Sequence, residues 1–320
     1  MIRLPKALPV RLLLSSLLLI FLSGCGLNTA PILDPKGPIA LAERDLLFAA
    51  LFVMMIVVIP VFVMAFLVVW RYRADGGKGK YTPDWGYSAG IDAVIWIVPA
   101  IIVIVLGVML WNATFKLNPY KPLASSEPAL EVQAIALDWK WLFVYPQYGV
   151  ATVNELAMPV NRPVSFKITS DTVMNSFFIP SLAGQIYAMA GMTTQLHLVA
   201  DSTGSFRGRN TQYSGDGFAE QWFEAHSMSN EDFEAWIEKV KQSDNGLDDA
   251  SYAELAKPTI KHEVEYYSSF APGLFGTILQ KYAMNQDHRN LICTTTAQSE
   301  PVTPQLASLR EDANVRHTDD

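Results

Sequence analysis

Few side chains in this sequence of 320 residues could bind a metal or act as a nucleophile. The five histidines show no pairing at metal-site spacing, so we interpret them as structural, and we expect the one at position 226 to be exposed at a strand end. They are His197, His226, His262, His288 and His317. The sequence has no nucleophile elbow, paired-histidine zinc motif or phosphate-binding loop, which disfavours a hydrolase.

The two cysteines have contrasting surroundings. Cys25 ends a Leu-Ser-Gly-Cys tetrapeptide directly after the short apolar run Leu12–Leu22, which basic residues precede. This arrangement resembles a bacterial lipoprotein signal peptide, and it predicts export, cleavage before Cys25 and lipidation of that cysteine with palmitate-type chains. A chance cysteine beside an apolar stretch is the alternative. Cys293 lies in a polar tail, so we expect no disulfide in the exported part.

Two long uncharged runs, Leu46–Trp70 and Ala93–Phe115, must anchor the chain. At about 1.5 Å per residue, a helix of either length crosses the roughly 30 Å hydrocarbon core of a bilayer. The loop between the runs contains several basic residues, and the positive-inside bias places it in the cytoplasm. The sequence therefore predicts a multi-pass hairpin in a bacterial inner membrane, with the C-terminal domain in the periplasm.

Charge divides the chain into two parts. Residues 1–122 contain 11 lysines and arginines against 6 acidic residues, whereas residues 123–320 contain 13 against 25. An acidic outer part argues against nucleic acid as a partner, because that partner requires basic patches. Its hydrophobic residues alternate with polar ones around Val132, Phe166 and Leu196, as in half-buried antiparallel strands. Turn residues at regular spacing favour a β-sandwich or barrel of about a hundred residues.

Three segments of this outer part resemble subunit II of the haem–copper respiratory oxidases. They are Asp138–Trp141, Ser170–Pro180 and Gly204–Gly208. The order of export signal, membrane hairpin and outer domain is also similar. The resemblance implies a cupredoxin-like sandwich on the outer face of a membrane complex.

In the cytochrome c oxidases of this family, the outer domain holds two copper ions through cysteine, histidine and methionine side chains and a backbone carbonyl. The resemblance puts residues without soft donor atoms at those positions, and they are Asn175, Asn210, Gln212, Ser214, Phe218 and Gln221. A shifted register ending at His226-Ser227-Met228 also lacks thiols. We therefore expect no metal or cofactor in this chain, and haems and copper in subunit I.

Without a copper centre that could pass electrons inward from cytochrome c, the chain resembles the quinol-oxidising branch of the family. This resemblance implies a non-catalytic subunit II of a ubiquinol oxidase, with subunit I, further small membrane subunits and the lipid bilayer as partners. Its role would be structural, in a complex that couples quinol oxidation to oxygen reduction and proton transport. A cytochrome c oxidase subunit with an undetected metal site, or a free-standing membrane lipoprotein for binding or assembly, remain alternatives.

Asp92 opens the second apolar run on the cytoplasmic side. The family has a glutamate at the matching place, four residues before the residue equivalent to Trp96, and that glutamate is implicated in proton entry. The resemblance makes Asp92 a proton-entry residue, although its side chain is one methylene shorter. The alternative is a helix N-terminal residue that complements the helix dipole.

A helical extension follows the outer domain. Ser229 and Asp232 suggest a capping box, and apolar residues follow at helical spacing. The predicted segments are a signal peptide at 1–24, an outer N-terminal segment at 25–45, the transmembrane hairpin at 46–115, the cupredoxin-like domain at 123–228, the aromatic-rich extension at 229–284 and a disordered tail at 285–320.

Overall fold

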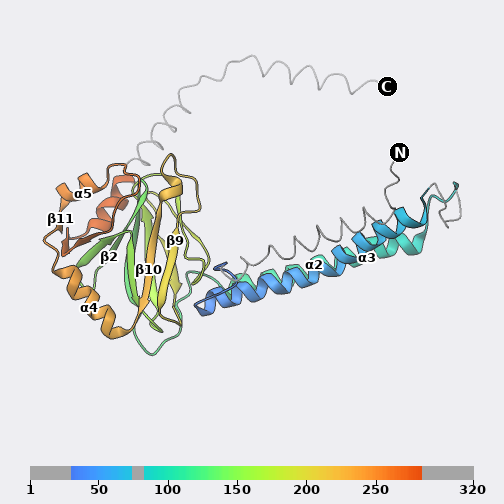
Figure 1. Cartoon of the computed structure of the whole chain (residues 1–320), viewed down its shortest axis with the longest axis horizontal. Coiled ribbons are helices and arrows are strands. Elements are labelled where there is room, and N and C mark those ends of the chain that lie inside the picture. Colours follow the sequence, from blue (N-terminus) through green and yellow to red (C-terminus); the bar gives the residue numbers. More distant parts are fainter. Residues whose placement is uncertain (1–29, 74–82, 283–320) are drawn as a thin grey trace, which may run out of the picture.

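The computed structural model describes residues 30–73 and 83–282 and contains two long helices beside a β-rich domain (Figure 1). The predicted signal peptide with Cys25, part of the basic loop, Cys293, His288, His317 and the predicted tail lie outside the described residues. The helices are α2 (Pro38–Arg71) and α3 (Ala89–Lys116), and both are long and apolar enough to cross a membrane. Their apolar side chains are exposed, as a surface in contact with lipid or other membrane chains requires.

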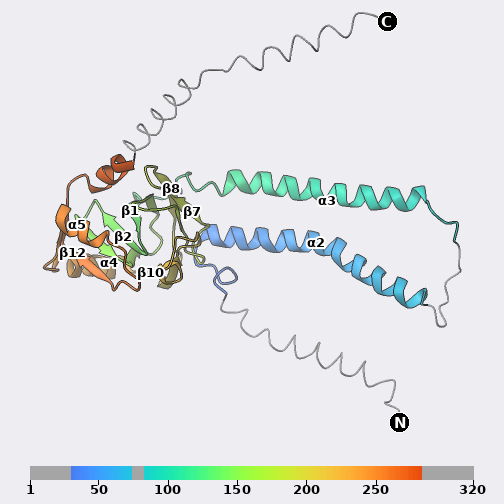
Figure 2. The same ribbon diagram turned by 90° about the horizontal axis from the view of Figure 1, so that it is seen from above.

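Both helices extend beyond the predicted apolar runs. Pro38 stands in the first turn of α2, where its missing N–H group costs no hydrogen bond. Figure 2 shows a bend in α2, and we attribute it to Pro60, which cannot donate to the helical hydrogen-bond ladder.

The segment before α2 joins the membrane part to the β domain. Lys36 donates its backbone N–H to Ser181 O at 2.7 Å and accepts from Asp201 N at 2.9 Å. A Cβ atom at Gly37 would lie 2.4 Å from Val199 O, so this close approach requires glycine. These contacts fix the start of α2 against the domain.

The domain is a β-sandwich, as the alternating pattern predicted. One sheet has the strand order β12-β3-β2-β1-β5-β8 and the other has the order β4-β10-β9. The first sheet comprises β1 (Leu130–Leu137), β2 (Lys140–Tyr145), β3 (Val150–Val153), β5 (Val164–Ser170), β8 (Thr194–Leu198) and β12 (Glu265–Tyr267). The second comprises β4 (Glu155–Pro159), β9 (Gly204–Arg209) and β10 (Trp222–Met228). A small hairpin pairs β6 (Asn175–Phe177) with β7 (Ile186–Ala188).

Aromatic side chains fill the space between the sheets. Phe177 stacks on Phe223 with ring centroids 5.2 Å apart, and Trp141 meets Phe177 edge-on at 5.3 Å. All three are fully buried. Offset and edge-on pairs of this kind add to the stabilisation that burial of their area provides.

The extension packs on the sandwich as helices and short strands. Ser229 accepts a hydrogen bond from Asp232 N at 3.1 Å and caps α4 (Asn230–Lys241), as the sequence indicated. Further along lie β11 (Gly246–Leu247), α5 (Asp249–Leu255), β13 (Ser269–Phe270) and a helical stretch at 274–282. Strand β12 pairs with β3, so the extension completes the edge of the larger sheet.

Candidate functional site

Four of the six positions that the resemblance assigned to copper ligands meet in one buried hydrogen-bond network, and we call Asn175, Asn210, Ser214 and Gln221 the amide cluster. Asn210 Nδ2 lies 2.7 Å from Asn175 Oδ1, 2.8 Å from Gln221 Oε1 and 3.1 Å from Ser214 Oγ. Asn210 stands directly after β9, Asn175 begins β6, and Gln221 follows the short 3-10 helix η2 (Phe218–Glu220). The cluster therefore ties the two ends of the loop between β9 and β10 to each other and to the start of β6.

The remaining polar atoms of the cluster bond to the backbone. Asn210 Oδ1 accepts from the N–H groups of Ser176 at 2.8 Å and Gln212 at 2.9 Å. Gln221 Nε2 donates to Leu137 O at 3.2 Å, and Asn175 Nδ2 donates to Val173 O at 2.8 Å. Because these amide side chains are almost fully buried, leaving any of them unpaired would be costly.

Trp139 covers the cluster. Its indole Nε1 donates to Ser214 O at 2.9 Å, and its ring packs against Gly217, where a Cβ atom would lie 2.3 Å from the ring. Trp139 has a φ of 75°, which is unusual for a bulky residue. The positive φ turns the chain tightly between β1 and β2, and the tryptophan lies over the loop that carries Ser214.

The other two assigned positions lie outside the cluster. Gln212 contributes only its backbone N–H, and its side chain is half-buried with no hydrogen bond among the described residues. Phe218 packs on Tyr213 at a ring distance of 5.7 Å. The structure thus brings four of the six aligned positions together, and the alignment did not show which side chains bond to each other.

The donor set of the cluster does not suit a soft copper pair. Copper of this kind prefers thiolate, thioether and imidazole ligands, whereas the cluster offers amide and hydroxyl groups that already bond to one another. Across residues 30–73 and 83–282, no group of three or more His, Cys, Asp or Glu side chains could hold a metal ion. The arrangement cross-links the loops that carry these residues.

A second polar centre binds the extension to the same loops. The Asp171 carboxylate accepts from Tyr252 OH at 2.7 Å and from Lys281 Nζ at 2.8 Å, and its backbone O accepts from Tyr282 OH at 2.6 Å. Lys140 is fully buried, and its Nζ donates to Lys257 O at 2.8 Å and to the Thr259 hydroxyl. Neither contact follows from a sequence pattern, and the only signals in the sequence were charged residues inside the Asp138–Trp141 and Ser170–Pro180 motifs.

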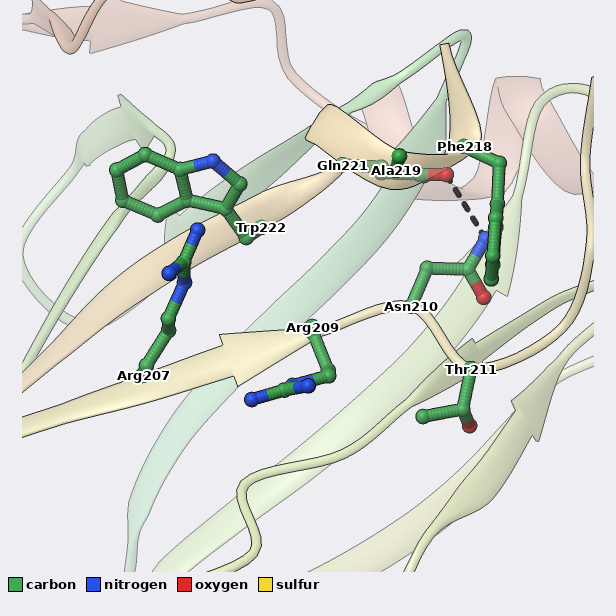
Figure 3. Close-up of a pocket in the computed structure, with 8 residues that line it drawn as sticks. All are labelled: Arg207, Arg209, Asn210, Thr211, Phe218, Ala219, Gln221 and Trp222. Atoms are coloured by element: carbon green, nitrogen blue, oxygen red, sulfur yellow. Dashed lines mark hydrogen bonds between the residues drawn. The ribbon is translucent and has the colours of Figure 1, made fainter. Parts of the chain in front are cut away.

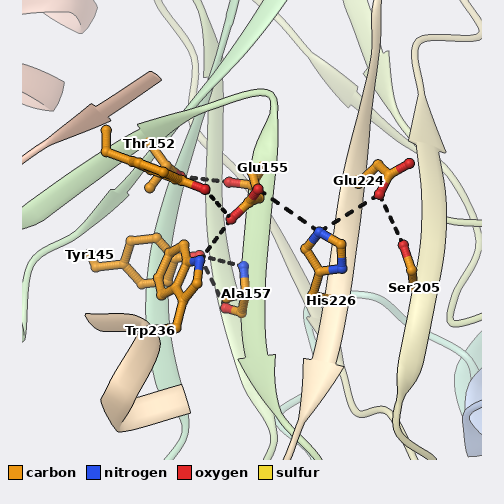
Figure 4. A network of polar contacts seen from close by, with 9 residues as sticks. Tyr145, Thr152, Glu155, Ala157, Ser205, Glu224, His226 and Trp236 are labelled. Atoms are coloured by element: carbon orange, nitrogen blue, oxygen red, sulfur yellow. Dashed lines mark hydrogen bonds and ion pairs between the residues drawn. The ribbon is translucent and has the colours of Figure 1, made fainter. Parts of the chain in front are cut away.

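The structure contradicts the expectation that His226 is exposed at the end of a strand. His226 lies in the middle of β10 and is half-buried, with Nε2 3.7 Å from Glu224 and 3.9 Å from Glu155 (Figure 4). The parallel pairing of β10 with β4 places His226 opposite Ala157, next to these acids, which a sequence pattern does not show. Glu155 also accepts from Trp236 Nε1 at 2.7 Å and from Tyr266 OH at 2.9 Å. This network attaches α4 and β12 to the second sheet.

Asp92 lies in the first turn of α3 and is partly exposed. Its backbone N–H bonds to Ser88 O at 3.0 Å. The position agrees with either interpretation of this residue, as a proton-entry carboxylate or as a helix N-terminal residue.

Comparison with known proteins gives a consistent set of relatives. The family model described as cytochrome c oxidase subunit II, periplasmic domain, matches residues 148–220, and the COX aromatic rich motif matches residues 241–286. The chain is 48% identical to cytochrome bo(3) ubiquinol oxidase subunit 2 of Pseudomonas putida, over 82% of this chain and 83% of the relative. It is 47% identical to ubiquinol oxidase subunit 2 of Acetobacter aceti, over 84% of this chain and 86% of the relative. It is 36% identical to quinol oxidase subunit 2 of Bacillus subtilis, over 84% of each chain. Among solved structures, the periplasmic domain of cytochrome oxidase subunit II from Bradyrhizobium japonicum is 23% identical, with 37% of this chain and 98% of that chain covered and a TM-score of 0.35.

We predict that Asn210→Ala destabilises the fold by about 2–4 kcal/mol, because it leaves several buried partners without a hydrogen bond. Gln212→Ala is the matched control, since it removes a similar amide that bonds to no described residue, and it should change stability by less than about 0.5 kcal/mol. Denaturant unfolding of the detergent-solubilised chain, followed by tryptophan fluorescence, measures both. Equal effects of the two substitutions would contradict the role given to Asn210.

We also predict that stability falls as the pH rises above 10. Burial and neighbouring carboxylates raise the pKa of Tyr252, Tyr266 and Tyr267 above the ordinary tyrosine value of about 10. The unfolded chain therefore releases protons that the folded chain keeps, so the stabilisation is complete below pH 10 and declines above it.

Tyr252→Phe should make this decline shallower, by at most about 1.4 kcal/mol per pH unit, because one releasing group is gone. Tyr213→Phe, at a side chain that is 71% exposed, should leave the slope unchanged. The free energy of unfolding, measured by denaturant titration at pH 8 and at pH 11, gives the slope for each variant and for the wild type. If the free energy of unfolding falls equally with pH in the wild type and in Tyr252→Phe, Tyr252 does not contribute to the loss of stability above pH 10.

Proposed function

The chain belongs to the family of quinol oxidase subunit 2 proteins, and from this we propose that it is the non-catalytic subunit II of a complex that oxidises ubiquinol and reduces oxygen to water. The observation that carries the proposal is the amide cluster, whose side chains bond to one another where the family's copper-bearing members hold metal. In this proposal the outer domain passes no electrons. Haems and copper belong to the partner subunit I.

The nature of the electron donor supports the proposal. A water-soluble donor such as cytochrome c delivers electrons from outside the membrane and needs a relay in the outer domain. A quinol dissolves in the bilayer and can be oxidised there by subunit I. An amide cluster of amide and hydroxyl side chains, at the positions where copper-bearing relatives hold metal, is compatible with the second route.

The remaining role of the domain is then to stabilise the outer face of the complex. Gly37 and the hydrogen bonds of Lys36 hold it firmly at the start of α2, and the Asp171 contacts bind the extension to it. We further propose that Cys25 is lipidated, that α2 and α3 span the inner membrane with their connecting loop in the cytoplasm, and that the domain is periplasmic. The basic loop and the Leu-Ser-Gly-Cys sequence support this orientation.

The decisive experiment is purification of the chain with its native partners in mild detergent. We expect copurifying haem, rapid oxidation of ubiquinol, and negligible oxidation of reduced cytochrome c. The visible and electron paramagnetic resonance spectra should lack the signature of a mixed-valence copper pair. That signature together with cytochrome c oxidation would support the cytochrome c oxidase alternative, and a haem-free protein that migrates alone would support a free-standing lipoprotein.

We propose that Asp92 feeds protons toward subunit I. Asp92→Asn should lower the turnover of the complex several-fold without changing its haem content, because an amide cannot take up and release a proton at neutral pH. Asp92→Glu should retain activity. Asp84→Asn, at an exposed position shortly before α3, is the control and should have no effect. Unchanged turnover of Asp92→Asn would leave Asp92 as a helix N-terminal residue.

A further inference from the structure

A pocket of about 480 Å³ lies beside the amide cluster, at the end of β9 (Figure 3). Its walls include Arg207, Arg209, Thr211, Phe218 and Trp222. The two arginines are two positions apart on one strand, so their side chains leave the same face of the sheet. The floor includes Asn210 and Gln221, whose polar groups already bond within the cluster.

Both guanidinium groups are available to a ligand. In the part of the chain that the structure describes, neither is within 4.0 Å of a carboxylate, although Glu224 stands directly opposite Arg207 across the strand pair. The Glu224 carboxylate instead lies 3.2 Å from Ser205 Oγ and 3.7 Å from His226 Nε2. Arg207 packs over the Trp222 ring at 4.3 Å, an arrangement that orients a guanidinium without neutralising it.

This charge is unusual for its surroundings. Residues 123–320 contain 25 acidic residues against 13 basic ones, yet the pocket has two exposed arginines and no acidic residue among its lining residues. Glu155, Glu220 and Glu224 line a neighbouring pocket that shares Trp222 with this one and also includes Lys261 and His262. The two arginines thus line a pocket without carboxylates, which suits an anion.

The pocket lies on the side of the domain that faces the membrane helices. Thr211 Oγ1 donates to Gln185 Oε1 at 2.6 Å, and the neighbouring Gly184 lies so close to Glu43 that a Cβ atom would be 2.5 Å from its carboxylate. Glu43 precedes the apolar run of α2 by three residues. Figure 1 shows β9 as the strand of its sheet nearest to α2 and α3.

We propose that Arg207 and Arg209 bind a phosphate group in this pocket, from either a phospholipid headgroup or free phosphate. Guanidinium groups match the oxygens of a tetrahedral phosphate with paired N–H donors, and the position near the expected bilayer surface brings headgroups within reach. The binding site is independent of electron transfer, so its test does not depend on the activity proposed above.

The test uses the purified complex and the variant Arg207→Gln/Arg209→Gln. One arm titrates inorganic phosphate and follows it by phosphorus NMR, and the other adds phosphatidylglycerol in mixed micelles and counts retained lipids by native mass spectrometry. We expect the variant to lose at least tenfold in affinity for whichever probe binds. The double variant Lys239→Gln/Lys241→Gln, which removes the same charge on α4, should bind like the wild type.

The two arms of the experiment distinguish a phospholipid headgroup from free phosphate as the source of the bound phosphate group. Arginine-dependent binding of both probes supports a general phosphate site, and binding of phosphatidylglycerol alone supports a headgroup site. Binding of neither probe, or equal binding by the arginine variant and the wild type, overturns the proposal. Loss of another oxidase subunit from the arginine variant also overturns it, because the arginines would then contact an acidic segment of a protein partner.

Discussion

The structure depends on the requirement that buried polar groups find partners inside the protein. The amide cluster meets this requirement where Asn210 joins the segment after β9 to β6 and to Gln221. An amide side chain serves here because it donates and accepts at once, whereas a hydrocarbon would leave the N–H groups of Ser176 and Gln212 without partners. A hydrogen-bonded set of this kind cross-links several loops through side chains alone.

The extension adds a second constraint on the same loops. Asp171 lies four residues before Asn175, and Lys140 lies three residues after Leu137, which accepts from Gln221. Both therefore flank the amide cluster, and both bond to residues beyond position 250. Because Asp171 and Lys140 are buried, the extension satisfies charges that would otherwise be costly. The aromatic-rich segment is thus part of the sandwich, and its loss would expose those charges.

Local features of the fold could be predicted from the sequence because local physics determines them. Alternation around Val132 predicted β1, the serine and aspartate near position 230 predicted the cap of α4, and hydropathy predicted both long helices. The family motif named the residues of the amide cluster but did not predict the hydrogen bonds between them. The partners of Asp171 lie 81 and 110 residues away, and the neighbours of His226 come from strand pairing. Periodicity contains no information on such long-range contacts, which follow only from how the sheets and the extension pack.

The junction at Gly37 determines how the domain meets the membrane. Lys36 bonds to two different loops of the sandwich, and the backbone of Gly37 packs against Val199 O, so the start of α2 has little freedom to rotate against the domain. The helices expose apolar surface along their length and must lie in lipid or against other membrane chains. In the membrane arrangement proposed above, these contacts also determine which way the face that carries Arg207 and Arg209 points relative to the bilayer. Orientation in this protein therefore follows from a few backbone contacts near one glycine.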